Sequence, residues 1–187
     1  IIAWLDYRRD DRSDIYAQKI NKEGLVKWPS GGVEIGRAVG WQRGPQMVSD
    51  NAGGAIVTWD DYRSGSNANP NTYAQRVNRE GTIEWTKYGV AVCPTATRQY
   101  WSSVVSDSAG GAIITWKDNR YGNPGDIYAQ HLNAAGVHSW NSNGVIISSA
   151  HNGQAFPAIV SINKQGAVIA WRDERNDNDG IENDYEI

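Results

Sequence analysis

Gly54-Ala55-Ile56-Val57-Thr58-Trp59-Asp60-Asp61-Tyr62-Arg63 is the stretch around which the 187-residue chain repeats. In it, an apolar, β-branched run ends in the pattern W-x-D-x-R. The same pattern occurs four times, at Trp4/Asp6/Arg8, Trp59/Asp61/Arg63, Trp116/Asp118/Arg120 and Trp171/Asp173/Arg175. The four tryptophans are separated by 55, 57 and 55 residues. This fixed period predicts one repeat array rather than two unlike domains.

Each period predicts four β-strands and no helix. The expected first strands are 46–50, 103–107 and 158–162, and a Gly-containing turn leads from each into the W-x-D-x-R strand. The expected third strands are 16–20, 73–77 and 128–132, each followed by an N-x-x-G turn. The fourth strands are expected to contain a second repeated tryptophan, at Trp28, Trp85 and Trp140. A loop with a repeated glutamine then leads to the next first strand, at Gln42, Gln99 and Gln154.

Four antiparallel strands in every unit predict an all-β protein, a β-propeller made of four-stranded blades. One such blade cannot bury both of its faces, so blades must stack on their neighbours. The repeats lie at about 1–45, 46–102, 103–157 and 158–187, of which the first and last are partial. That is about three and a half blades. We therefore expect residues 1–187 to form one section of a larger ring, or of a ring that another chain completes.

The motifs resemble a known group of repeats. The S-D-x-x-G turn, the W-x-D-x-R strand end and the D-I-Y-A-Q third strand at 14–18 and 126–130 are similar to the repeats of TolB-like and WD-like bacterial propellers. They resemble still more the GGAIxTW…DIYAQ repeats of large secreted or surface proteins. The resemblance covers the whole chain. It implies an interaction or scaffold module outside the cell or at its surface, with the periplasm as the alternative, and no particular enzyme.

Composition narrows the choice of partners. The net charge is −3 and the pI about 5.6, which gives no indication of nucleic acid or of an anionic membrane. No apolar run approaches the roughly 20 residues that a membrane-spanning helix needs. Cys93 is the single cysteine, which excludes an intrachain disulfide. Ile1 is not a natural start, so we expect that a leader was removed or left out.

The W-x-D-x-R residues are predicted to be structural, because an element present in every blade belongs to the fold more often than to a site. The aspartate can cap the loop backbone, and the arginine can pair with it or lie over the tryptophan. The Ser49-Asp50-x-x-Gly53 turn resembles the Asp-box of sialidases. Its spacing differs, however, so no sialidase chemistry is transferred to it.

The loops after the second and fourth strands carry the variation in length and should lie on one face, where repeat proteins usually bind. Aromatic residues without a repeat partner gather in these segments: Trp41, Tyr62, Tyr100, Trp101, Phe156 and Tyr121. Exposed rings of this kind can stack on sugars, and they can equally pack over a neighbouring blade.

The last loop is the most acidic. Asp177, Asp179, Asn183 and Glu186 partly fit an oxygen-rich calcium site, so calcium is the one cofactor that the sequence suggests. Arg175 stands where the first carboxylate ligand belongs, and a solvated acidic loop is the alternative.

Two functions are therefore open. The first is a non-catalytic extracellular scaffold or binding module, whose partner is a protein or the remainder of the propeller. The second is a carbohydrate-binding or carbohydrate-processing propeller that uses the loop aromatics and the acidic residues.

Overall fold

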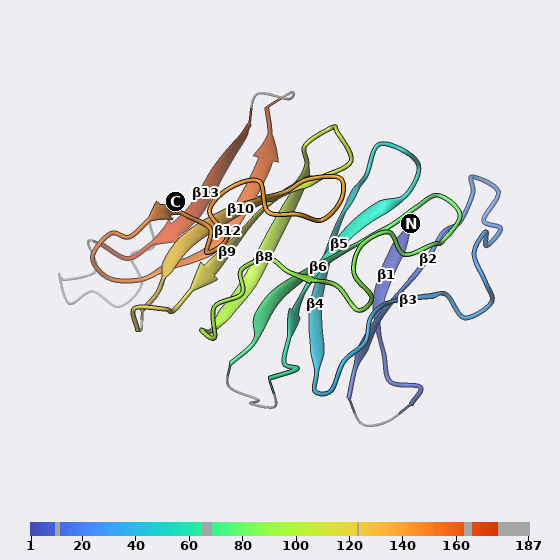
Figure 1. Cartoon of the computed structure of the whole chain (residues 1–187), viewed down its shortest axis with the longest axis horizontal. Helices are drawn as coiled ribbons and strands as arrows, with labels where there is room; N and C mark the ends of the chain where they lie inside the picture. Colours follow the sequence, from blue (N-terminus) through green and yellow to red (C-terminus); the bar gives the residue numbers. More distant parts are fainter. Residues whose placement is uncertain (10–11, 65–68, 123, 163–165, 176–187) are drawn as a thin grey trace.

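The computed structural model describes residues 1–9, 12–64, 69–122, 124–162 and 166–175, and the regular elements in that part are all β-strands (Figure 1). Sheet 1 consists of β1 (Ile2–Asp6), β2 (Asp14–Gln18) and β3 (Val33–Gly36). Sheet 2 consists of β4 (Gln42–Ser49), β5 (Ala55–Asp61), β6 (Asn71–Val77) and β7 (Val90–Ala91). Sheet 3 consists of β8 (Gln99–Ser106), β9 (Ala112–Asp118), β10 (Asp126–Leu132) and β11 (Val145–Ser148). Sheet 4 contains β12 (Gln154–Ser161) and β13 (Ala167–Asp173).

Within each sheet, strands that are consecutive in the sequence pair in antiparallel order. The sheets stand side by side, and the hydrophobic core lies between them (Figure 1). Trp59 of β5 is fully buried against Gly36 of sheet 1, and Trp116 of β9 belongs to the cluster between sheets 2 and 3. These stacked antiparallel units are consistent with a propeller-like fold. The described residues show a row of sheets and not a closed ring.

The first strands begin earlier than the sequence predicts. They start at Gln42, Gln99 and Gln154, four residues before the expected positions, so these glutamines are strand residues and not loop residues. In each strand the register shifts, because two residues oppose a single tryptophan on the partner strand. This β-bulge interrupts the alternation of side chains, and that is why the pattern ends there in the sequence.

The fourth strands are shorter than predicted. They begin at Val33, Val90 and Val145, and the repeated tryptophans precede them. The backbone N–H of Trp85 donates to Oε1 of Gln75, and that of Trp28 donates likewise to Gln18, both at 3.0 Å. At the tryptophan, the backbone N–H is therefore bonded to a glutamine side chain of the third strand and not to the backbone of a neighbouring strand. The sequence also predicts that the last unit ends in a third strand, and that segment lies outside the described residues.

The two ends of the sheets differ. The connections from first to second strand and from third to fourth strand lie at one end, here called the turn end. The connections that follow each second strand and precede each first strand lie at the other, the loop end (Figure 1). The described part of the chain contains no helix that is long and apolar enough to cross a membrane.

Candidate functional site

The W-x-D-x-R side chains form the same hydrogen-bonded unit in all four sheets. Each tryptophan donates its indole N–H to the aspartate at 2.8–3.0 Å, and the aspartate also accepts the backbone N–H of the arginine at 2.9–3.0 Å. The guanidinium pairs with the same carboxylate at 2.5–2.7 Å. In the first three sheets it lies 3.7–4.1 Å from the ring of the third-strand tyrosine. Of the two arrangements that the sequence left open for the arginine, the structure has the pair with the aspartate and not the contact with the tryptophan. These hydrogen bonds tie the second strand to the loop that follows it, although Nε of Arg120, unlike that of the other three arginines, is buried without a hydrogen-bond partner among the described residues.

The bulges of the first strands lie at the loop end, opposite these tryptophans. The residues at corresponding bulge positions are Gly44, Trp101 and Phe156, with φ values of +60°, +59° and +53°. Glycine adopts this left-handed conformation freely, whereas a bulky aromatic residue is strained in it. Sheets 3 and 4 thus hold aromatic side chains in a conformation that costs roughly 1–3 kcal/mol each. Bulges commonly re-aim a side chain beside a functional site.

The two re-aimed rings stack on each other across the sheets. Trp101 and Phe156 have ring centroids 4.0 Å apart and planes inclined by 23°, and Tyr100 meets Trp101 edge-on at 4.9 Å. Trp101 nevertheless remains 40% exposed and Phe156 51% exposed. We call Trp41, Tyr62, Tyr100, Trp101 and Phe156 the aromatic cluster.

Cations border the aromatic cluster. Arg43 lies 4.4 Å from the ring of Trp41 and 5.8 Å from that of Tyr62. Lys117 Nζ lies 5.2 Å from the ring of Trp101, and burial lowers the pKa of this lysine. Burial and the negative charge of Asp60 raise the pKa of Tyr62, while Arg43 and Arg98 lower it.

Asp60 is a member of the site that the sequence did not single out. It follows Trp59 on β5, and its carboxylate accepts a hydrogen bond from the backbone N–H of Trp101 on the neighbouring sheet. Burial raises the pKa of Asp60 to about 7, because the low-dielectric surroundings disfavour the ionised form. The sequence held a sign of this role, because the position after the repeated tryptophan varies while the motif around it is constant. The four residues there are Leu5, Asp60, Lys117 and Arg172.

Five of the six aromatic candidates lie near the starts of the first strands of their sheets. Only some of the five are loop residues. Tyr100, Trp101 and Phe156 belong to strands β8 and β12, which corrects their placement in loops; the cause is the early start of these strands. Ring contacts join Tyr100, Trp101 and Phe156, whereas Trp41 contacts Tyr7. Tyr121 is 81% exposed and lies beside Tyr128. The calcium candidates Asp177, Asp179, Asn183 and Glu186 lie outside the described residues. Among the described residues, no three His, Cys, Asp or Glu side chains are grouped to hold a metal ion.

The cluster combines apolar ring faces with hydrogen-bond donors. Half-exposed rings offer apolar faces, and guanidinium and ammonium groups donate hydrogen bonds at their borders. Glycoside hydrolysis generally needs two carboxyl groups roughly 5–9.5 Å apart across the scissile bond. Of the carboxylates described near the rings, Asp60 is bonded to a backbone N–H and Glu174 pairs with Arg172 at 2.6 Å.

The fold and the site together describe an all-β protein of stacked antiparallel sheets with aromatic side chains gathered at the loop end. No family model matches the chain, and no curated protein matches it. Among solved structures it is similar to the endo-arabinase from Bacteroides thetaiotaomicron VPI-5482, with 13% sequence identity and a TM-score of 0.52. The match covers 88% of this chain and 62% of the endo-arabinase, so the chain spans about three fifths of that enzyme's length. At this identity the likeness shows the fold alone.

Proposed function

We propose that the chain is a section of an extracellular β-propeller that binds a carbohydrate through the aromatic cluster without cleaving it. One observation carries the proposal. Trp101 and Phe156 adopt left-handed φ values at positions where sheet 2 has Gly44, and their rings remain 40% and 51% exposed. Strain of this kind persists where the surrounding structure enforces it, commonly at ligand sites.

The ligand class follows from the chemistry of the cluster. Sugar rings present C–H faces that stack on aromatic rings, and their hydroxyl groups accept hydrogen bonds from arginine and lysine. The similar solved structure is an endo-arabinase, which makes arabino-oligosaccharides the first probes to choose. We also propose that the repeats are of the TolB-like type and that the section completes a larger ring. Calcium binding by the acidic loop is a further part of the proposal.

Replacement of the bulge aromatics by glycine tests it, because Gly44 shows that glycine is accommodated at this position. Trp101→Gly and Phe156→Gly should retain the fold, since glycine removes the backbone strain while the ring contact is lost. Each variant should weaken the binding of oligosaccharide about two- to tenfold, given roughly 0.5–1.5 kcal/mol for one stacked ring. Binding is followed by isothermal titration calorimetry and on a glycan array.

Tyr121→Ala is the matched control, because it removes an exposed ring that is not part of the cluster. This variant should bind sugars as the parent does. Wild-type chain that gives no response to any sugar on the array, or a Trp101→Gly variant that binds undiminished, would exclude the carbohydrate role.

A protein partner is the second candidate, because Trp, Tyr and Arg together are also the side chains that dominate protein interfaces. Arg43 lies against two rings of the cluster, as such interface residues do. A glycan array without signal, combined with loss of a protein partner in Trp101→Gly, would favour this scaffold function.

A further inference from the structure

Lys117 of β9 is, among the described residues, the one lysine or arginine that is buried, with 8% of its surface exposed. Lysine is seldom buried to this extent unless an anion pairs with it. In the part of the chain that the structure describes, however, its Nζ atom forms no hydrogen bond and no ion pair. Nζ lies 5.2 Å from the ring of Trp101 and 5.9 Å from that of Tyr100. The lysine thus brings an ammonium group to the aromatic cluster without a described counter-ion.

The charges around Lys117 do not supply this counter-ion. Burial lowers the pKa of Lys117, Glu174 raises it, and Arg172 and Arg98 lower it, so one carboxylate and two other cations act on the same place. The carboxylate of Glu174 pairs with Arg172 at 2.6 Å. A buried charge that is not paired costs stability. A ligand therefore explains a lysine at this position better than the fold does.

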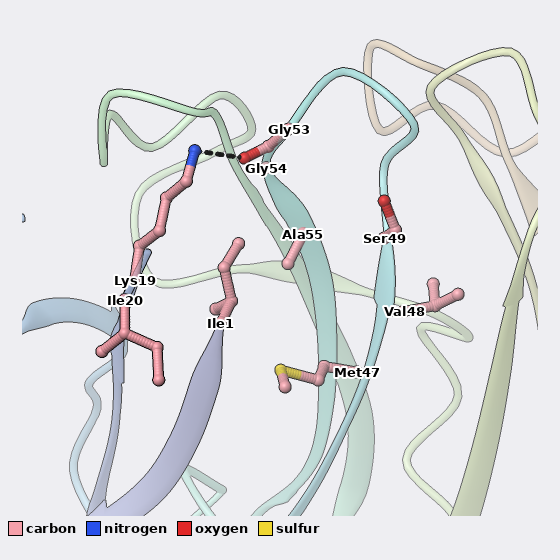
Figure 2. A pocket seen from close by; sticks show the side chains of 9 residues that line it. All are labelled: Ile1, Lys19, Ile20, Met47, Val48, Ser49, Gly53, Gly54 and Ala55. Carbon is pink, nitrogen blue, oxygen red and sulfur yellow. Dashed lines mark hydrogen bonds between the residues drawn. The ribbon is translucent and has the colours of Figure 1, made fainter. Parts of the chain in front are cut away.

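A second lysine shows how the fold satisfies an ammonium group without a carboxylate. Nζ of Lys19, in a pocket at the turn end, donates to the carbonyl of Gly53 at 2.9 Å (Figure 2) and to that of Arg79 at 3.3 Å. Lys117 has no such acceptor among the described residues. Its Nζ is not one of the fully enclosed polar atoms that lack a partner there, so the atom remains in contact with solvent. A ligand can therefore reach it.

Three cations each lie close to two rings of the aromatic cluster. Lys117 is the first. Arg98 lies 5.8 Å from the ring of Tyr100, and while burial raises the pKa of Tyr62, the charge of Arg98 lowers it. Arg43 is beside two other rings of the cluster, at 4.4 and 5.8 Å. Cations and rings are therefore interspersed along the loop end.

The two arginines of this group are not neutralised by described carboxylates either. Arg43 and Arg98 form no ion pair in the described part of the chain, whereas the arginine of every W-x-D-x-R motif pairs with its aspartate. Both arginines are exposed. Asp60, a carboxyl group beside the rings, accepts the backbone N–H of Trp101. The loop end thus presents positive charge next to the rings, although the net charge of the chain is −3.

We propose that the aromatic cluster binds an acidic oligosaccharide, in which a sugar stacks on Trp101 and Phe156 while its anionic substituent, a carboxylate or a sulfate ester, binds Nζ of Lys117. Arg98 and Arg43 bind the acidic groups of neighbouring sugars. The inference rests on the proposed carbohydrate function and names the class of sugar. A neutral sugar offers stacking but leaves the ammonium group without an anion, whereas an anionic group accepts a charge-assisted hydrogen bond from it.

Oligogalacturonates and their methyl esters are the matched probes, because esterification removes the carboxylate charge and keeps the sugar and its linkage. Isothermal titration calorimetry should show that the acid binds at least about tenfold more tightly than the ester, as expected for a hydrogen bond to a charged group. Carrageenan oligosaccharides with and without their sulfate esters are the corresponding pair for sulfate. The pair that shows the difference identifies the anionic substituent.

Lys117→Met keeps the aliphatic stem of the lysine and removes its charge. The variant should bind the acidic probe at least about tenfold more weakly, bind the neutral probe as wild type does, and retain or exceed the wild-type Tm, because an unpaired buried charge is lost. Lys19→Met is the matched control at the turn end and should bind both probes as wild type does. Arg98→Gln, at an exposed position, should also weaken the acidic probe selectively, and it tests the proposal even if Lys117→Met fails to fold.

Equal affinity for the acidic and neutral members of both pairs overturns the proposal and leaves the carbohydrate function standing. No response to any sugar excludes the carbohydrate function as well. A loss in Lys117→Met that is the same for acidic and neutral probes also overturns the proposal, since the ammonium group then has no specific role. Binding of a polyglutamate peptide that depends on Lys117, with no acidic sugar bound, overturns it in favour of a protein partner.

Discussion

Asp60 is a carboxyl group whose pKa is raised far above that of a free aspartate side chain. Its carboxylate lies between β5 and the bulge of β8, where burial raises its pKa to about 7. The corresponding residues of the next two sheets are cationic, and Glu174 raises the pKa of Lys117 against the effect of burial. At neutral pH, therefore, one carboxyl beside the aromatic cluster is close to half protonated.

Asp60→Asn tests this protonation. Because the folded-state pKa is raised, the folded protein binds the proton more tightly than the unfolded chain does. The stability that this group contributes is full below about pH 4 and is lost as the pH rises to about 7. Asparagine resembles the protonated form, so the variant should be more stable than wild type above pH 7, by on the order of 2–4 kcal/mol.

Urea unfolding at pH 4, 5.5, 7 and 8 measures the difference. Wild type and variant should be similar at pH 4 and should diverge steadily towards pH 7. A constant difference across this range would show that the carboxylate is ionised throughout, and that its pKa is not raised.

At the scale of the element, the turn that precedes each fourth strand depends on one glycine. Gly89 has φ +95°, and a Cβ atom there would lie 2.5 Å from Cη2 of the buried Trp59. Gly32 and Gly144 lie in the same way against Trp4 and Trp116. The glycine thus lets the fourth strand pass directly over the repeated tryptophan.

Gly89→Ala should destabilise the protein by about 3 kcal/mol or more, because left-handed strain adds to a collision with a packed ring. Gly24→Ala is the control: Gly24 has φ +80° with nothing within 4 Å of the added Cβ, so strain alone should cost about 1 kcal/mol. Urea unfolding compares the two. Equal losses in both variants would contradict close packing of Gly89 on Trp59.

The sequence predicted the second and third strands well because their alternation and flanking turns recur in phase. It misplaced the ends of the first and fourth strands, because these depend on contacts that leave no periodic pattern in the sequence. The bulge at Trp101 breaks the alternation of the first strand, and the side chain of Gln75, not a strand, receives the N–H of Trp85. The sequence singled out the rings of the aromatic cluster as residues without a repeat partner, whereas the structure shows that Trp101 and Phe156 hold the same bulge position in successive units. Asp60 was missed because it lies inside the motif, at a position treated as variable.

At the scale of the whole molecule, neighbouring sheets are joined at the turn end by the second repeated tryptophan. The indole N–H of Trp28 donates to the carbonyl of Arg79 at 3.1 Å, and that of Trp85 donates to the carbonyl of Ala134 at 3.0 Å. Each ring also covers the glycine of the turn it reaches, Gly81 or Gly136. Sheet 1 is therefore bonded to sheet 2, and sheet 2 to sheet 3, as in arrays whose stability depends on nearest-neighbour interfaces.

Trp85→Phe should weaken the interface between sheets 2 and 3, because phenylalanine keeps most of the apolar contact but cannot donate to Ala134. We expect a loss of about 1 kcal/mol or somewhat more, since the carbonyl is left with less than its full hydrogen bonding. Trp140→Phe is the control, because Trp140 is 38% exposed and packs edge-on against His131 of its own sheet. Hydrogen exchange should show the loss at sheets 2 and 3 together, since an interface stabilises both of its partners. If Trp140→Phe costs as much as Trp85→Phe, the indole hydrogen bond does not couple the sheets.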